Sequence, residues 1–347
     1  MQAIFSARKR TESQIACKQT PTKHLPKSPV INPLTQRIRL RLLYLNPSRT
    51  KDPMGRRDFL KGTLLTAAAA GLPRGEAAGA PTTNRAADTA DARIDVNVSL
   101  FQWPCRRLPL DRTDALVGKL RQHGFTAAWA GSFEGILQRD IAGVNERLAA
   151  ECRRVGGGLL VPFGSVNPAL PDWEEDVRRC HEKFGMRGIR LHPNYHGYTL
   201  DDPRFARLLA MAAERNLLVQ IAVLMEDTRT HHHLMRVADV DVTPLIDLMA
   251  RTPRARVLLL NSGKILQRPP ERFAAARGLY HDIARVDGSG EVARVMRALP
   301  RGAVVFGTHA PFFIFESALI KIDEAGLEPA DVRALLAENA RALLARA

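Results

Sequence analysis

Eight short apolar runs, most of them rich in valine, isoleucine or leucine, constrain the fold of this chain more than any other feature. They cover residues 93–100, 127–132, 159–166, 188–194, 218–224, 256–263, 278–286 and 303–312. Amphipathic segments lie between them at residues 114–123, 172–184, 203–216, 244–251 and 291–299. Strands that alternate with helices pair in parallel through right-handed crossovers. Eight such units in about 250 residues predict an α/β fold, a closed (β/α)8 TIM barrel over residues 93–347.

An open, doubly wound sheet is the alternative arrangement for the same alternation. That fold commonly carries a G-x-G-x-x-G phosphate-binding turn after its first strand, and no such motif follows residues 93–100. The expected helix starts fit a regular α/β layout, because Asp202-Pro203 and Thr243-Pro244 each join a capping residue to a proline suited to the first helical position. We therefore favour the barrel.

The formal net charge of +15 is concentrated at the N-terminus. Residues 1–53 carry a net charge of +9 and residues 54–80 a net charge of +2, which leaves +4 for the remaining 267 residues. The body of the chain therefore has no basic stripe of the kind that follows nucleic-acid phosphates. We expect a small-molecule ligand and no nucleic-acid partner.

The segment MGRRDFLKG at residues 54–62 resembles a twin-arginine export signal. A short, alanine-rich apolar run at residues 63–72 follows the arginine pair, and Ala78-Gly79-Ala80 matches the A-x-A pattern of signal-peptidase sites. The run is too short to remain in a bilayer as a spanning helix. We expect a signal peptide over residues 54–80, export by the twin-arginine machinery to the periplasm or beyond, and no stable membrane span.

Residues 1–53 precede this signal and are polar, basic and rich in proline. A twin-arginine signal normally begins a protein, so we expect Met54 to be the true start. Residues 1–53 are then an upstream extension, disordered if it is translated. Residues 81–92 are expected to form a linker.

Polar side chains fall at or near several of the predicted strand ends. The carboxyl ends of the strands carry the chemistry in a (β/α)8 barrel, so we take these residues as candidates for a ligand site. They are Asn97, His192, Asn194, Tyr195, His196, Arg229, Asn261, Asp282, Arg285 and His309. The loop at residues 103–107 is expected to lie over the barrel mouth, and Phe312 and Phe313 are expected to wall it.

Several motifs, in the right order, resemble the amidohydrolase-related, metal-dependent hydrolases. They are IDVNVSL at residues 94–100, GIRLHP at 188–193 followed by DDPRF at 201–205, VVFGTHAPF at 304–312 and ENARALL at 338–344. These segments resemble the first strand, the fourth strand and its helix, the eighth strand and the closing helix of that family. The resemblance covers residues 93–344 and implies a metal-dependent-hydrolase barrel, in agreement with the strand pattern.

The resemblance also implies a divalent metal, often zinc. Its ligands are an H-x-H pair on strand one, histidines that end strands five and six, and an aspartate that ends strand eight. At the matching positions this chain has Asn97, Ser99, Ala222, Asn261 and His309. Amide and hydroxyl groups are poor zinc ligands and alanine offers none, so we expect the standard metal site to be absent.

The alternative is a divalent metal such as zinc, bound at a non-standard site. The remaining histidines give little support for such a site. His192 and His196 are four residues apart, but we expect the chain to leave the strand through Pro193 without a helical turn, so that helical pairing of two ligands does not apply. His231 to His233 are expected in a solvated loop.

Acid/base chemistry can proceed without a metal, because histidine titrates near neutral pH. We predict His192, His309 and Asp282 as the catalytic groups. Asn97 and Asn261 would donate to a carbonyl group.

The other candidates are assigned to the substrate. Arg229 and Arg285 would anchor a carboxylate through a guanidinium fork, and Asn194, Tyr195 and His196 would complete the contacts. The predicted function is that of an exported hydrolase or related lyase acting on a small carboxylated or amide-type molecule. The alternatives are a catalytically inactive barrel that binds a small molecule and a non-catalytic partner subunit; homo-oligomer formation is left open.

Overall fold

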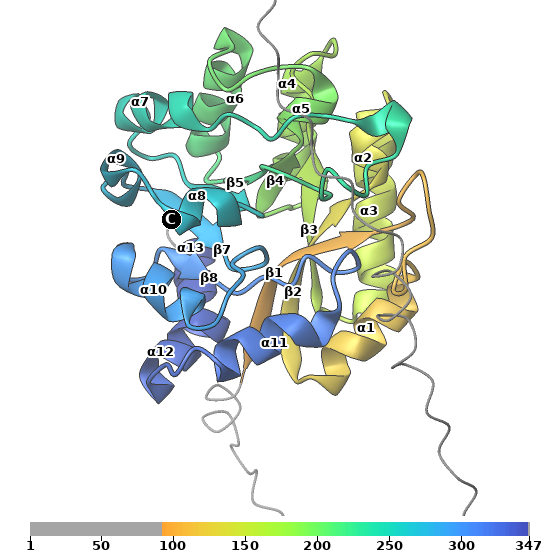
Figure 1. Cartoon of the computed structure of the whole chain (residues 1–347). Coiled ribbons are helices and arrows are strands. Elements are labelled where there is room, and N and C mark those ends of the chain that lie inside the picture. Colours follow the sequence, from red (N-terminus) through yellow and green to blue (C-terminus); the bar gives the residue numbers. More distant parts are fainter. Residues whose placement is uncertain (1–91, 346–347) are drawn as a thin grey trace, which may run out of the picture. The chain divides into compact units, whose positions relative to one another are not determined.

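The computed structural model describes residues 92–345. The predicted extension at residues 1–53, the signal at 54–80 and nearly all of the linker at 81–92 lie outside these residues. Figure 1 shows a central ring of strands surrounded by helices. Within the described part of the chain, no helix is long and apolar enough to cross a bilayer.

Eight parallel strands form the barrel that the sequence predicts, in the order of the chain. They are β1 (Arg93–Leu100), β2 (Phe125–Ser132), β3 (Leu160–Ser165), β4 (Gly188–Leu191), β5 (Leu218–Ala222), β6 (Val257–Leu260), β7 (Leu279–Asp282) and β8 (Val304–Val305). The chain after β8 hydrogen-bonds to β1, since Val96 N donates to Phe306 O and Ser99 N to Ala310 O, both at 2.9 Å. This pairing joins the last strand region to the first, and the predicted TIM barrel is confirmed.

Helices surround the strands (Figure 1). They are α1 (Thr113–Gln122), α2 (Glu134–Leu137), α3 (Ile141–Gly156), α4 (Trp173–Glu182), α5 (Pro193–His196), α6 (Pro203–Glu214), α7 (Thr243–Arg251), α8 (Gly263–Gln267), α9 (Glu271–Ala274), α10 (Glu291–Ala298), α11 (Phe315–Asp323), α12 (Pro329–Arg333) and α13 (Asn339–Ala345), with a 3-10 turn η1 (His233–Met235) and a π-helical turn η2 (Ala334–Glu338). Helix α6 starts as predicted, because Pro203 occupies the first turn and the Asp202 carboxylate accepts a hydrogen bond from Arg204 N.

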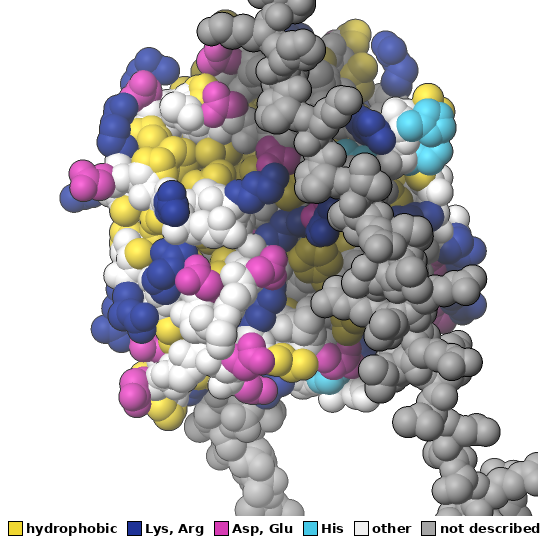
Figure 2. Space-filling model, in the orientation of Figure 1, with side chains coloured by type: hydrophobic (Ala, Val, Ile, Leu, Met, Phe, Trp, Pro, Cys, Tyr) yellow, Lys and Arg dark blue, Asp and Glu magenta, His cyan; other side chains and the backbone are white. Residues whose placement is uncertain are grey.

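Charged and apolar side chains are both visible on the face shown in Figure 2. Apolar surface gathers at its upper left, where Figure 1 labels α7 and α9. A pocket of about 500 Å³ lies there, lined mainly by Ile246, Met249, Ala250, Ala275 and Ala276.

A buried arginine fills the middle of the barrel. Arg190 on β4 donates to Val98 O at 2.7 Å, to Trp129 O at 3.1 Å and to Gln220 Oε1 at 2.8 Å. Gly131 must be glycine for this packing, because a Cβ there would lie 2.6 Å from the Arg190 side chain. The barrel is therefore a packed core, as in other (β/α)8 folds, and only its mouth is available for chemistry.

In two places the apolar run that predicts a strand is longer than the strand itself, and the chain turns at the barrel mouth instead. Strand β8 ends at Val305, and His309 adopts a left-handed φ of 59°. Strand β4 ends at Leu191, and α5 begins at Pro193. Apolar composition continues past both strand ends because these residues cover the mouth.

Candidate active site

Four predicted site residues meet at the floor of the barrel mouth: Asn97, Asn261, Asp282 and His309. We call this group the floor. Asn97 Nδ2 donates to Asp282 Oδ2 at 2.6 Å and to Asn261 Oδ1 at 2.9 Å, and Asn261 N donates to Asp282 Oδ1 at 2.9 Å. All four are at most 2% exposed. Residues 164 to 185 positions apart in the chain are thereby bonded to one another, which supports their common location at the strand ends.

Local backbone conformation turns two of these side chains into the floor. Asn261 and His309 follow β6 and β8 with left-handed φ values of 60° and 59°. Asparagine tolerates this region comparatively well, and a positive φ in a residue with a Cβ often marks a constrained site. The strand pattern alone gives no sign of these turns.

The His309 ring is fully engaged. Its Nε2 lies 2.7 Å from Met225 O, and a carbonyl only accepts, so Nε2 carries the proton. Its Nδ1 lies 3.3 Å from Asn261 Nδ2, which donates to it. Burial lowers the pKa of His309 to about 3. The ring is therefore neutral at physiological pH, with both nitrogens occupied.

Asp282 is the acidic member of the floor. Burial raises its pKa to about 6, while hydrogen bonds from Asn261 N and Asn97 Nδ2 oppose the rise. Both carboxylate oxygens accept hydrogen bonds from floor residues. The group is thus built into the floor and does not face solvent.

The floor does not fit a divalent metal. A metal needs lone pairs that converge on one point. Here the Asp282 oxygens accept protein N–H groups, the Asn97 and Asn261 amides point their N–H atoms at carbonyl or carboxylate oxygens, and His309 is bonded at both nitrogens. Among residues 92–345, no group of three or more His, Cys, Asp or Glu side chains is arranged to hold a metal ion.

His192 lies at the end of β4, on another side of the mouth. It is 2% exposed, and its Nδ1 is buried without a hydrogen-bond partner. Burial lowers its pKa well below the ordinary value, with smaller contributions from His196 and Arg190. His192 is therefore a neutral imidazole whose Nδ1 makes no bond within the protein.

The expectation of an irregular segment after Pro193 is wrong. Residues Pro193–His196 form the helical turn α5, because proline fits the first helical position and His196 N donates to His192 O at 3.0 Å. The rings of His192 and His196 lie 6.0 Å apart. His196 Nε2 is bonded to Gly135 O at 2.9 Å, so this ring holds α5 against α2.

An aromatic cap covers the mouth. The ring of Trp103, from the loop after β1, makes edge contacts with Phe133 at 5.3 Å, Phe312 at 4.9 Å and Tyr195 at 6.2 Å. Phe312 also stacks on His309 at 4.9 Å. The predicted positions of the 103–107 loop and of Phe312 agree with this cap.

An ion pair ties the cap to the loop after β5. Arg106 Nη2 lies 2.6 Å from Glu226 Oε1, and the Glu226 side chain is 2% exposed. The Arg106 guanidinium also lies 5.8 Å from the Phe312 ring centroid. The loops after β1 and β5 are thereby connected across the covered mouth.

The other predicted substrate contacts lie in different surroundings. Asn194 Nδ2 donates to Ala238 O at 2.9 Å, and the Tyr195 hydroxyl is buried without a partner. Arg285 lies over the Phe313 ring at 4.9 Å, and its Nε is buried and unpartnered. The Arg229 side chain is 87% exposed and pairs with Asp227 at 2.9 Å, so it is not brought into the floor.

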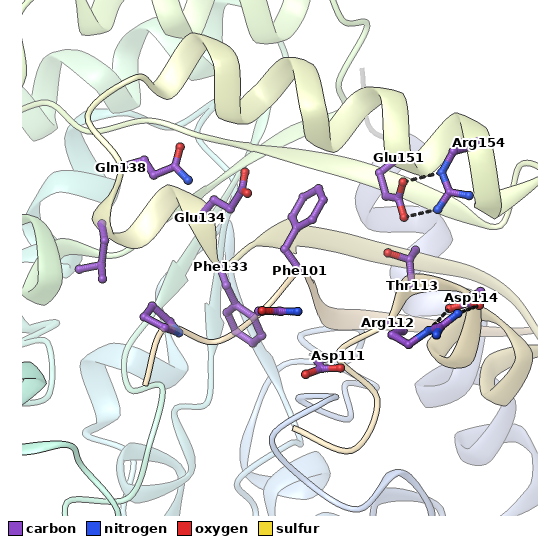
Figure 3. Close-up of a pocket in the computed structure, with 13 residues that line it drawn as sticks. Phe101, Asp111, Arg112, Thr113, Asp114, Phe133, Glu134, Gln138, Glu151 and Arg154 are labelled. Atoms are coloured by element: carbon purple, nitrogen blue, oxygen red, sulfur yellow. Dashed lines mark hydrogen bonds and ion pairs between the residues drawn. The ribbon is translucent and has the colours of Figure 1, made fainter. Parts of the chain in front are cut away.

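A pocket of about 720 Å³ lies outside the cap (Figure 3). Phe133 lines it and also contacts Trp103, so pocket and cap share this ring. Its carboxylates are paired, for example Glu151 with Arg154 at 2.7 Å. The pocket was not predicted, since its lining comes from three separate segments of the chain.

Sequence reasoning missed Glu226, Arg190 and the role of Trp103. An arginine within the apolar strand β4 and a glutamate four residues after β5 were available signals, because buried charges need partners. The partners themselves, Val98 O and Arg106, are distant in the chain and become visible only in the folded barrel.

The solved structures with the same fold include several decarboxylases. A 2,6-dihydroxybenzoate decarboxylase from Rhizobium is 13% identical with a TM-score of 0.59, and the match covers 73% of this chain and 98% of that one. A 5-carboxyvanillate decarboxylase from Novosphingobium aromaticivorans, complexed with manganese, is 12% identical with a TM-score of 0.57, covering 74% and 96%. A dihydroxybenzoic acid decarboxylase from Polaromonas, with bound manganese, is 13% identical with a TM-score of 0.58, covering 73% and 97%. At this identity the likeness shows the fold alone.

Family comparison adds two matches. A twin-arginine translocation signal matches residues 53–73, which confirms the predicted export route. The curated proteins give no significant match. An amidohydrolase family model matches residues 76–346, which include the whole barrel. The chain therefore belongs to the amidohydrolase family, as the strand motifs and the eight-stranded barrel indicate.

Proposed function

We propose that this exported protein is a hydrolase or lyase that acts on a small carboxylated or amide-type molecule at the barrel mouth, with His192 as its acid/base group and no metal at the floor. The observation that carries the proposal is the unpartnered Nδ1 of His192, beside a floor whose His309 is bonded at both nitrogens. A proton-transfer group needs an atom that is free to meet the substrate.

The floor residues have a positioning role in this proposal. Asp282 and His309 bond to groups from the ends of other strands and hold the mouth in shape. Asn97 and Asn261 already donate their amide hydrogens to groups within the protein. A carboxylate on the substrate would be held by Arg285, whose Nε has no partner. The decarboxylases that share the fold support a carboxylated substrate.

The test measures turnover of two probes by the purified protein: release of carbon dioxide from 2,6-dihydroxybenzoate and of ammonia from benzamide. His192→Gln is expected to lower kcat/KM by about 10²-fold or more, because general acid–base catalysis contributes that much. His181→Gln, on the exposed surface of α4, is the matched control. Turnover that persists in His192→Gln, or that is lost on treatment with a chelator and restored by manganese, would contradict the proposal.

A second candidate is a barrel that binds a small molecule without turnover. The observation that favours it is the closed mouth, in which the floor is at most 2% exposed beneath Trp103 and Phe312. Saturable binding of the same probes with no product formed at any pH would support this candidate.

A further inference from the structure

Four buried polar atoms from the loop after β1 and from the chain after β4 have no partner. They belong to Trp103 (Nε1), His192 (Nδ1), Tyr195 (hydroxyl) and His196 (Nδ1), and each is buried. We call these four residues the wall. Trp103 and His192 are each 2% exposed. Native proteins pair nearly all buried polar atoms, so a group of four that is unpaired needs an explanation.

The four side chains form two pairs that the turn α5 links. The rings of Trp103 and Tyr195 lie 6.2 Å apart, and those of His192 and His196 lie 6.0 Å apart. Tyr195 and His196 are consecutive residues of the turn α5. Leaving a buried donor or acceptor unpaired carries a free-energy cost. A bound polar group that meets several of these atoms would remove that cost.

The chemistry of three wall members limits what each can do, whereas His192 Nδ1 can donate or accept, depending on the tautomer of its ring. Trp103 Nε1–H can only donate. The His196 Nε2 faces a carbonyl, Gly135 O, and must therefore carry the proton, which leaves Nδ1 as an acceptor. The Tyr195 hydroxyl can do both. A ligand group that meets both rings must therefore accept from the indole and donate to the His196 imidazole.

None of the four wall side chains carries a positive charge of its own, and the Arg190 guanidinium that acts on His192 is itself engaged by Val98 O, Trp129 O and Gln220. Burial lowers the pKa values of His192 and His196, so both rings are neutral at pH 7. A carboxylate offers only acceptors, and its oxygens would meet the lone pair of His196 Nδ1. An alcohol or a carboxamide is neutral and offers both a donor and an acceptor.

We infer that the wall binds an uncharged group that both donates and accepts, a hydroxyl or a carboxamide, and that it disfavours a carboxylate. The inference rests on the proposed function in that it concerns the same mouth. It assigns any carboxylate of the substrate to the side of Arg285, away from α5.

The experiment compares three probes of similar size, benzamide, benzyl alcohol and benzoate, by calorimetric titration of the purified protein. Benzamide or benzyl alcohol is expected to bind about tenfold more tightly than benzoate, the ratio that corresponds to one unpaired buried group. Whichever of benzamide and benzyl alcohol binds more tightly identifies a carboxamide or a hydroxyl as the preferred group.

Two conservative variants test the wall directly. Trp103→Phe keeps an aromatic ring but removes the donor, and His196→Gln keeps an N–H for Gly135 O but removes the Nδ1 acceptor. Each is expected to weaken binding of the uncharged probe by about tenfold. His196→Gln should also reduce the difference in affinity between the uncharged probe and benzoate. Trp173→Phe, in α4, is the matched control and should bind like the wild type.

The outcomes separate this inference from the proposed function. Equal or tighter binding of benzoate, no binding of any probe, or unchanged binding in both variants would overturn the inference, whatever the turnover. A preference for the uncharged probes without turnover would leave the inference standing and remove the catalytic proposal.

Discussion

The floor and the wall of the barrel mouth are both buried and polar, yet they differ in how their polar atoms are used. In the floor, the Asp282 carboxylate, the Asn97 amide and both His309 nitrogens are bonded within the protein. In the wall, Trp103 Nε1 and His192 Nδ1 are unpaired. Paired atoms stabilise the strand ends, and unpaired atoms are available to a ligand. In our proposal the floor is therefore the structural half of the mouth and the wall is the binding half.

The largest expected effect comes from breaking the floor. Asp282→Leu removes the acceptor of Asn97 Nδ2 and of Asn261 N, leaving a buried backbone N–H unpaired. The free energy of unfolding should fall by about 3 kcal/mol, measured by urea denaturation at pH 7. Asp287→Ala, which removes an exposed partner of Lys321, is the control and should change stability by less than about 0.5 kcal/mol. Equal effects in the two variants would show that the floor stabilises the fold no more than an exposed ion pair does.

A pH series sharpens the comparison within the floor. His309 has a folded pKa of about 3 against an ordinary 6.5, so the unfolded chain binds more protons between these values. Its contribution to stability is complete above pH 6.5 and is lost as pH falls toward 3. Asp282 has the opposite sign, since its folded pKa of about 6 exceeds 3.8 and its contribution is lost as pH rises through 6.

The measurement is urea unfolding of the wild type and His309→Gln between pH 4 and 7. Buried His281, with a pKa of about 4, acts in the same direction as His309, whereas Asp176, with a pKa of about 6, acts in the direction of Asp282. The test is therefore the difference between the two proteins: stability should rise less, or fall more, between pH 4 and 6.5 in His309→Gln than in the wild type. An unchanged slope would mean that His309 is not held neutral by the floor.

The smallest effect is expected in the wall. Tyr195→Phe deletes a buried hydroxyl that has no partner and keeps the ring against Trp103. The free energy of unfolding of the ligand-free protein should change by less than about 1 kcal/mol, in either direction, because no hydrogen bond is lost. A loss as large as that of Asp282→Leu, measured in the same denaturation assay, would show that the wall is as structural as the floor.

The sequence predicted the fold well because each strand carries its own local signal. The eight apolar runs and the helix start at Asp202-Pro203 are patterns of neighbouring residues. It also predicted that the polar candidates cluster, since parallel strand ends meet at one edge. It did not predict which candidates bond to each other. The Arg229 side chain points into solvent, whereas Asn97 donates to Asp282, which lies 185 residues further along the chain.

The sequence by itself determined the export signal, the alternation that produces the barrel, and the amide residues Asn97 and Asn261 at positions where the family resemblance implies metal ligands. Only the tertiary structure decided that these amides bond to one another while the groups beside α5 stay unpaired. The physical reason is that a hydrogen bond depends on the distance and angle between two atoms. For side chains far apart in the chain, those quantities exist only once the strands have closed into a ring.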